Sequence, residues 1–373
     1  CIRDRHNIIK EDIQVIFTKS QFKMYKYYES WDEYKSFYKK YNCTAGICNV
    51  EEDKVKNAKI NYQMLQTLTN ITDHEIDMLT EKSVEKIESV CTSKYTMMNI
   101  LGVTPYNTKM TPFQKAIKIY PSLLSDTYAK DVIREVKDSL LKKYRSGKLE
   151  VIGKYTFLLP DFYAACEYWF GGIENPNGLL SDREVFCNLF KKSDKLDCLR
   201  SPHLYKEHAI RFNVASDGYG DRVSKIKEWF TTNAVYTSVH DLISKILQFD
   251  VDGDKSLVVA EPNFVRIAER NMNGVVPLYY NMRKADPTLL NNKTIYTGLN
   301  AAFTHGNIGI YSNDISKIWN NDVFIAGNEE EQKEAIDTVK LLCMENNFCI
   351  DSAKTLYMPE RPAVSYTHLR AHE

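Results

Sequence analysis

Asp250-Val251-Asp252-Gly253-Asp254 places three carboxylates within five residues and interrupts them with a single glycine. A helix-like run from His240 to Phe249 precedes this stretch, and an apolar, strand-like run from Ser256 to Ala260 follows it. Three aspartates so close in sequence repel one another unless a cation lies between them. Because every donor atom is a carboxylate oxygen, a hard divalent ion such as Mg²⁺ or Ca²⁺ is the expected partner.

The residues alone allow three interpretations of this stretch. It could be an acidic surface turn, since Asp and Gly are common in turns, but the strongly apolar flanks argue against one. It could be an EF-hand calcium loop that begins at Asp250 and ends at Glu261, although Lys255 stands where such a loop needs glycine. It could also be a catalytic Mg²⁺ site for nucleotidyl transfer, in which Mn²⁺ could replace Mg²⁺.

The third interpretation fits the spacing best. Alternate carboxylates of an extended segment point to one side, and Gly253 lets the backbone curl so that Asp254 joins the other two. Mg²⁺ keeps open coordination sites for a substrate, which suits three carboxylates without a complete protein cage.

Length and composition indicate an ordinary globular protein. The 373 residues suffice for two or three domains, and 43% of them are hydrophobic. With 49 basic and 49 acidic residues, the chain is not uniformly basic, although a local basic channel for nucleic acid remains compatible. The nine cysteines form no C-x-x-C pair and predict free thiols in a reducing cytoplasm. No apolar run reaches the roughly 20 residues of a membrane span, and we expect no signal peptide.

Residues 51–150 predict a helical module. Thr72 to Glu75 has the pattern of a capping box, and Thr111-Pro112 is typical of a helix start. Asp126 to Tyr144 is amphipathic and carries basic residues near its end, as the helix dipole favours.

From Val151 onward, short strand-like runs such as Tyr155 to Leu159 alternate with helices. Because no hairpin turns join these runs, the pattern indicates a small interlocked barrel. Further on, Glu329 to Asn346 predicts an amphipathic helix, and Phe348 to Asp351 a short strand or turn.

The first 50 residues contain a strand-like run, Ile13 to Phe17, and then interleaved lysines and aromatic residues from Ser20 to Tyr41. Such interleaving is compatible with contacts to nucleic-acid phosphates and bases. A helix that packs its aromatic face against the protein is the interpretation that the pattern favours.

The Asp250 to Asp254 motif resembles the D-x-D-G-D signature of the two-barrel RNA polymerases. That superfamily includes the multisubunit transcriptases, the cellular RNA-dependent RNA polymerases of RNA silencing and single-chain polymerases of bacterial prophages. Four further segments resemble elements of the silencing branch and occur in the same order: Asn61 to Gln66 with Ile71 to Ile76, Leu199-Arg-Ser-Pro-His-Leu204, Asn307-Ile-Gly-Ile-Tyr-Ser-Asn313 and Ile350-Asp-Ser-Ala-Lys-Thr355. The resemblance covers roughly residues 20–362.

The resemblance implies an α+β fold in which a catalytic double-psi β-barrel, the second of two barrels, is flanked by mainly helical segments. The expected divisions are the end of an incomplete first barrel with a connector (1–50), a helical connector (51–150), the catalytic barrel with its aspartates (151–260), a helical region (261–362) and a tail (363–373).

The resemblance also implies roles for single residues. Asp250, Asp252 and Asp254 would be the catalytic Mg²⁺ ligands, and Gly253 would shape their loop. Arg200, His203 and Lys354 would contact nucleotide or nucleic acid, although from the residues alone the first two could stabilise a turn and Lys354 could be a solvated surface lysine. The partners would be nucleoside triphosphates, an RNA product and an RNA or DNA template. A non-catalytic Ca²⁺-binding or helical interaction protein is the alternative.

The chain begins at Cys1, and its end, Val364 to Glu373, reads like a translated sequencing adapter. We therefore expect a fragment of a cytoplasmic enzyme of bacterial or phage origin. By the resemblance, the first barrel, which supplies basic residues to the triphosphate, would precede Cys1. The fragment alone would bind Mg²⁺ weakly and would not polymerise. The template stays open, because the silencing-type segments favour RNA whereas prophage relatives transcribe DNA.

Overall fold

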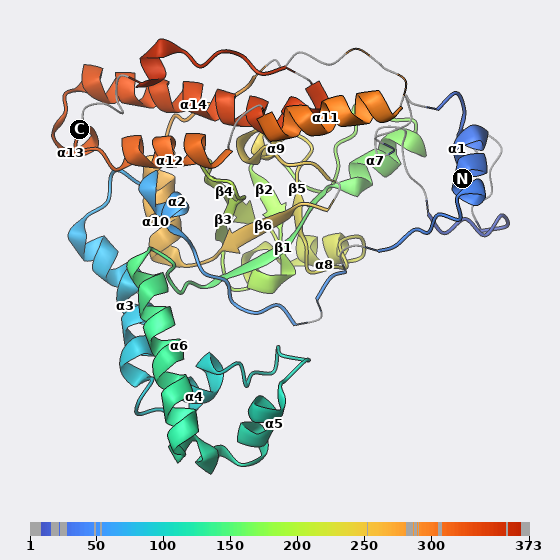
Figure 1. Ribbon diagram of the computed structural model, residues 1–373. Helices are drawn as coiled ribbons and strands as arrows, with labels where there is room; N and C mark the ends of the chain where they lie inside the picture. The colour runs from blue at the N-terminus through green and yellow to red at the C-terminus, as the bar shows by residue number, and fades with distance from the viewer. Residues whose placement is uncertain are drawn as a thin grey trace.

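The computed structural model describes residues 9–15, 22, 28–47, 50–52, 54–251, 253–280, 286, 289, 291–304, 308–355 and 357–366, with only the backbone at Ala353 and Lys354. A closed β-barrel lies at the centre, and helices flank it on several sides (Figure 1). This arrangement confirms the predicted α+β fold class.

The barrel has six strands: β1 (Gly153–Pro160), β2 (Glu184–Phe186), β3 (Lys195–Leu199), β4 (Ala209–Asn213), β5 (Val235–Thr237) and β6 (Lys255–Val259). They are hydrogen-bonded in the order β1-β5-β2-β4-β3-β6, and β6 closes the ring on β1. The β1–β5 and β2–β4 pairs are parallel and the other four are antiparallel. In this ring β1 is not a neighbour of β2, and β2 is not a neighbour of β3. The connections between the strands therefore interlock, as predicted for a double-psi barrel.

The apolar run predicted as a strand after the aspartates is β6, and it is buried on both faces. Val258 packs inside the barrel with Leu158 and Val235. Leu257 and Val259 point the other way and pack against Phe264 of α10 (Pro262–Asn271). Side chains of a strand alternate between its two faces, so a strand covered on both sides reads as a continuous apolar run.

Four helices form an arm that leads away from the barrel: α3 (Asp73–Ser89), α4 (Lys94–Ile100), α5 (Pro112–Ile119) and α6 (Thr127–Arg145) (Figure 1). The capping box predicted at Thr72 is present, and the helix start predicted at Thr111-Pro112 is confirmed and also forms a capping box. Asp126 caps α6. The arm has its own apolar core, which includes Val90 and Ile117.

The C-terminal helices are α11 (Asn292–Thr304), α12 (Ile308–Trp319), α13 (Val323–Ala326) and α14 (Glu329–Thr355). The prediction of a strand or turn at Phe348 to Asp351 is wrong, because these residues belong to α14. The buried face of α14 continues from Leu342 through Cys343 to Cys349 at helical spacing, and this face packs against α12.

The remaining α-helices of the described chain are α1 (Trp31–Lys40), α2 (Tyr62–Gln66), α7 (Phe162–Trp169), α8 (Asp221–Lys227) and α9 (Ile243–Leu247). Short 3-10 helices are also present, including η2 (Pro121–Ser125), η3 (Asn188–Phe190) and η4 (Asp217–Tyr219). In α1, Trp31 stacks on Tyr34 and no residue is buried. The strand predicted from Ile13 is absent at residues 13–15, and Ile16 and Phe17 lie outside the described residues. The seven cysteines that the structure describes are all free thiols. Among the helices described, none has the length and apolar character needed to cross a membrane.

Candidate active-site loop

Residues 250–254, here called the Asp loop, connect α9 to β6. The chain enters the loop through Gln248, whose φ of 50° is left-handed, and leaves it through Gly253 at φ 116°. A Cβ on Gly253 would meet no heavy atom within 4 Å, so the backbone conformation and not lack of space requires glycine here. Asp252 lies outside the described residues.

Asp254 is held through both its backbone and its side chain. Its carbonyl oxygen accepts a hydrogen bond of 2.9 Å from the Leu158 amide of β1. Its carboxylate Oδ2 accepts a hydrogen bond of 3.0 Å from the amide of Asp250. The first of these bonds fixes the base of the loop to the barrel, and the second closes the loop into one turn.

Arg200, at the end of β3, bridges the two ends of this turn. Its Nη1 donates to the carbonyl oxygen of Gln248 at 2.6 Å, and its Nη2 lies 3.0 Å from Oδ2 of Asp254. The side chains of Arg200 and Asp254 are 29% and 24% exposed. A guanidinium therefore reaches the loop from a neighbouring strand while remaining accessible to solvent.

The donor atoms present are compatible with a hard divalent cation. The Asp250 residue is exposed, and no described residue donates a hydrogen bond to its carboxylate. Oδ1 of Asp254 is likewise without a described donor. Free carboxylate oxygens on one turn are the ligand type that Mg²⁺ prefers. The described residues, which do not include Asp252, contain no complete group of three acidic, histidine or cysteine ligands.

The EF-hand interpretation is wrong. A calcium loop needs Glu261 on the same ion as Asp250, but the five-residue strand β6 separates Glu261 from the Asp loop. An extended strand of this length spans about 16 Å. At the far end of β6, the Glu261 carboxylate forms an ion pair with Lys82 of α3.

His203 does not lie where a nucleotide could reach it. Its side chain is fully buried, and its Nε2 lies 3.2 Å from Oγ1 of Thr67. Burial, together with the neighbouring His208, holds the pKa of His203 well below its ordinary value, so the ring is neutral. The expectation of a nucleotide contact at His203 is therefore replaced by a packing role between the barrel and the residues that follow α2.

A buried polar network beside His203 had no clear signal in the sequence. His208 Nδ1 lies 2.6 Å from Oδ2 of Asp197 on β3, and both side chains are 0% exposed. The other ring nitrogen of His208 lies 3.1 Å from the Met64 carbonyl oxygen and 3.2 Å from Oγ1 of Thr67. The network therefore ties the barrel to α2, across more than 100 residues of sequence.

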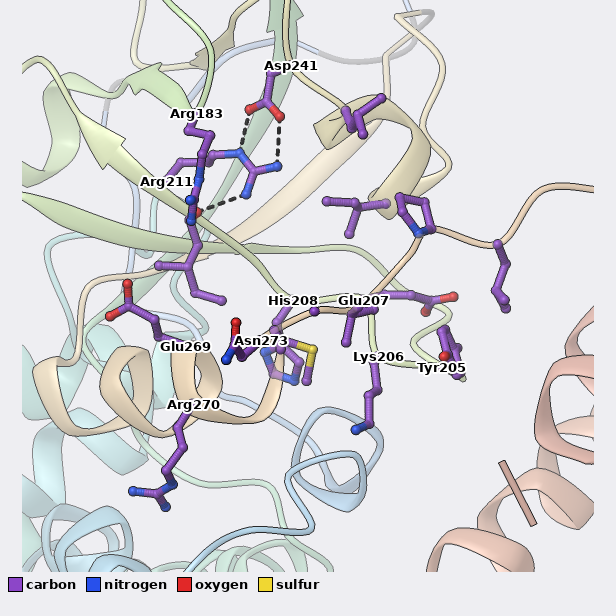
Figure 2. A pocket seen from close by; sticks show the side chains of 18 of the residues that line it. Arg183, Tyr205, Lys206, Glu207, His208, Arg211, Asp241, Glu269, Arg270 and Asn273 are labelled. Atoms are coloured by element: carbon purple, nitrogen blue, oxygen red, sulfur yellow. Dashed lines mark hydrogen bonds and ion pairs between the residues drawn. The ribbon is translucent and has the colours of Figure 1, made fainter. Parts of the chain in front are cut away.

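A cavity of about 910 Å³ lies beside β4, with Glu207, Arg211 and Asp241 in its wall (Figure 2). Gln248, two residues before the Asp loop, also lines it. Arg211 of β4 binds Asp241 through two nitrogens, one at 2.8 Å, so the two buried charges neutralise each other. Burial raises the pKa of Glu207 in the same wall to about 7. Arg211 and Asp241 lie 30 residues apart, and only the lone arginine in the apolar strand Ala209–Asn213 could have indicated the pair.

Lys354 lies near the end of α14, and its side chain is outside the described part of the chain. The structure thus brings together Asp250, Asp254, Gly253 and Arg200, and it separates His203 from them. The described residues give no position for the Asp252 or Lys354 side chains.

No protein-family model matches the chain. Over 357 residues, 95% of its length, the chain is 50% identical to the DNA-directed RNA polymerase YonO of Bacillus phage SPbeta. It spans 40% of the length of that relative. Among solved structures, the RNA-dependent RNA polymerase QDE-1 from Thielavia terrestris matches 87% of this chain and 38% of its own, with a TM-score of 0.48 and 13% identity.

Half of the aligned residues are identical over nearly the whole chain, and the D-x-D-G-D motif lies in a loop of a closed six-stranded barrel. The chain is therefore similar, along nearly its whole length, to a part of a DNA-directed RNA polymerase.

Proposed function

We propose that this chain is the metal-binding catalytic part of a DNA-templated RNA polymerase, in which Asp250, Asp252 and Asp254 hold Mg²⁺. The proposal depends on one observation above all. Asp250 and Asp254 share a single turn at the rim of the barrel, and Arg200 bridges that turn. DNA is preferred as the template because the relative at 50% identity is named a DNA-directed RNA polymerase.

Mg²⁺ bound at this loop would lower the pKa of an RNA 3′-hydroxyl and offset the charge of a nucleoside triphosphate. The residues of the chain would hold the metal ligands and the substrate in position. The hydrogen bonds at Asp254 fix one carboxylate relative to β1, while the exposed Asp250 carboxylate stays available. Arg200 offers a partly exposed guanidinium beside the carboxylates, where it can contact a ribose or phosphate oxygen of the substrate.

We further propose that residues 151–260 act as the catalytic barrel of a longer polypeptide and that residues 51–150 connect it to an earlier barrel. Basic residues of that earlier barrel would then neutralise the triphosphate. The chain by itself would bind the metal weakly and would not extend RNA.

A segment exchange tests the proposal. The homologous segment of the YonO polymerase is replaced by this chain, and RNA extension is measured with matched DNA and RNA templates. We expect extension on DNA, and we expect Asp252→Asn to abolish it. Asp221→Asn, an exposed aspartate of α8, is the matched control and should be fully active.

The metal role is measured separately on the chain itself by titration with Mn²⁺ and detection of bound ion by electron paramagnetic resonance. The unchanged chain should bind Mn²⁺ weakly, and a variant with Asn at positions 250, 252 and 254 should not. Equal binding by both proteins, or extension by the Asp252→Asn exchange, contradicts the assignment. Extension on an RNA template but not on a DNA template contradicts the proposal that the template is DNA.

A further inference from the structure

The segment of the arm between α3 and α6 carries lysines but no acidic residue of its own. From Ser89 to Ser125 the chain contains four lysines and no Asp, Glu or Arg, although the whole protein has a net charge of zero. This segment, here called the arm tip, comprises α4, α5 and the turns around them. Figure 1 shows α4 and α5 at the end of the arm that lies away from the barrel.

The four lysines of the arm tip are Lys94, Lys109, Lys115 and Lys118. All four are exposed, and none of them forms an ion pair with a described residue. Lysines nearer the barrel behave differently, since Lys82 pairs with Glu261 and Lys86 pairs with Glu150. The lysines near the barrel thus form ion pairs that hold the arm against it, whereas the lysines of the arm tip have no acidic partner within the described chain.

Large aromatic and apolar side chains accompany these lysines on the surface. Tyr95 is 79% exposed, Ile119 is 84% exposed and Tyr120 is 60% exposed. Exposed rings between unpaired lysines are the combination that binds single-stranded nucleic acid, because bases stack on the rings while phosphates meet the cations. An acidic protein would use the lysines but would not require flat rings.

The arm tip is also rigid enough to present this surface. Ile117 and Val90 are fully buried in its own core. The side chain of Gln114 completes the capping box at Thr111 and donates to the Leu101 carbonyl oxygen at 2.8 Å. The exposed lysines and tyrosines lie outside this core, so their replacement should leave the fold intact.

We propose that the arm tip binds single-stranded nucleic acid, with phosphates at the four lysines and bases stacked on Tyr95 and Tyr120. The site is separate from the Asp loop and does not need a bound metal. Residues 51–150, which the sequence predicts only as a helical connector, would thus also contact nucleic acid. RNA and DNA share the chemistry required, and the experiment below distinguishes them.

Binding is measured by fluorescence anisotropy with labelled single strands of about 16 nucleotides, as RNA and as DNA, without divalent metal. The lysine variant carries Gln at positions 94, 109, 115 and 118. The control variant carries Gln at four other exposed lysines without described ion pairs: Lys192, Lys225, Lys227 and Lys333. A third variant, Tyr95→Ala with Tyr120→Ala, removes the stacking surface. Circular dichroism checks that each variant is folded.

Four phosphate contacts contribute a slope of about 3 in the logarithm of affinity against the logarithm of salt concentration. A fourfold rise in salt concentration should therefore lower the affinity of the unchanged chain for single strands about 50-fold more than it lowers that of the lysine variant. The tyrosine variant should lose about five- to 150-fold in affinity per stacked base with an unchanged salt slope. Duplex DNA should bind less tightly than either single strand.

The proposal is overturned if the unchanged chain does not bind single strands, or if the lysine variant binds with the same affinity and salt slope. Equal loss in the control variant also overturns it, because the effect would then be one of net charge. An effect of the lysines without any effect of the tyrosines also overturns it, because the lysines would then attract phosphates without any stacking of bases. Replacement of the Asp loop carboxylates should leave binding unchanged, so failure of the proposed catalytic role is a separate result.

Discussion

Glu150 joins the arm to the barrel, and its replacement by glutamine should loosen that junction. Its carboxylate lies 2.8 Å from the ammonium groups of Lys59 and Lys86, and it accepts a hydrogen bond of 2.7 Å from the Tyr144 hydroxyl. Burial disfavours the charged form, but the bonds from the two lysines and the tyrosine outweigh burial. They bring the pKa of Glu150 down from 4.5 to about 2.

The lowered pKa of Glu150 gives the size of its contribution to folding stability and the direction in which that contribution changes with pH. A depressed carboxylate pKa stabilises the folded state above the unfolded-state pKa, and this contribution disappears as the pH falls from about 4.5 to about 2. A difference of about 2.5 units is worth about 3 kcal/mol at pH 7, since each unit is worth about 1.4 kcal/mol. The side chain is only 18% exposed, so solvent screening leaves most of this value.

Hydrogen exchange of the amides in α3 and α6 is the suitable assay, because it reports the free energy of opening of the arm itself. Glu150→Gln should accelerate exchange roughly 100-fold at pH 7 and much less near pH 3. Glu135→Gln, at an exposed glutamate of α6 without a described ion pair, is the control. Equal protection of Glu150→Gln and the control at pH 7 would refute the reasoning.

Three further predictions concern the barrel and its loop. Gly253→Ala places a Cβ on a backbone at φ 116°, which costs about 1–3 kcal/mol, and should weaken Mn²⁺ binding in paramagnetic titrations while circular dichroism stays unchanged. Arg200→Ala removes the contacts to Gln248 and Asp254, so exchange of the Asp250 amide should accelerate, whereas unchanged protection would contradict the bridging role. Asp197→Ala leaves the buried Nδ1 of His208 without its partner and should lower the unfolding free energy in urea by about 1–3 kcal/mol. Asp194→Ala, before the same strand, should have little effect.

The sequence predicted those features that depend on neighbouring residues. The capping box at Thr72, the helix start at Thr111-Pro112 and the strand after the aspartates depend on local spacing, and the structure contains all three. The D-x-D-G-D motif likewise indicated a tight loop before that strand.

The features that sequence reasoning missed depend on residues distant in the chain. Asp197 and Thr67 meet at His208 only because α2 packs beside β3 and β4. The same packing buries His203, although its neighbour Arg200 reaches the surface. Phe348 was misassigned because a short apolar run cannot by itself distinguish a strand from the last turns of a buried helix. The metal-binding role of the three aspartates stays a prediction.

Closure of the barrel has a kinetic consequence for the Asp loop. The loop is followed directly by β6, and β6 pairs with β1, about 100 residues earlier in the chain. Contacts between segments so distant in sequence form slowly, because the intervening chain must first be ordered. The turn of Asp250 and Asp254 is anchored to β1 through Leu158, so it cannot take its final shape before β6 has paired with β1. During synthesis, Asp250 and Asp254 should therefore reach the arrangement proposed for metal binding only after β6 has left the ribosome.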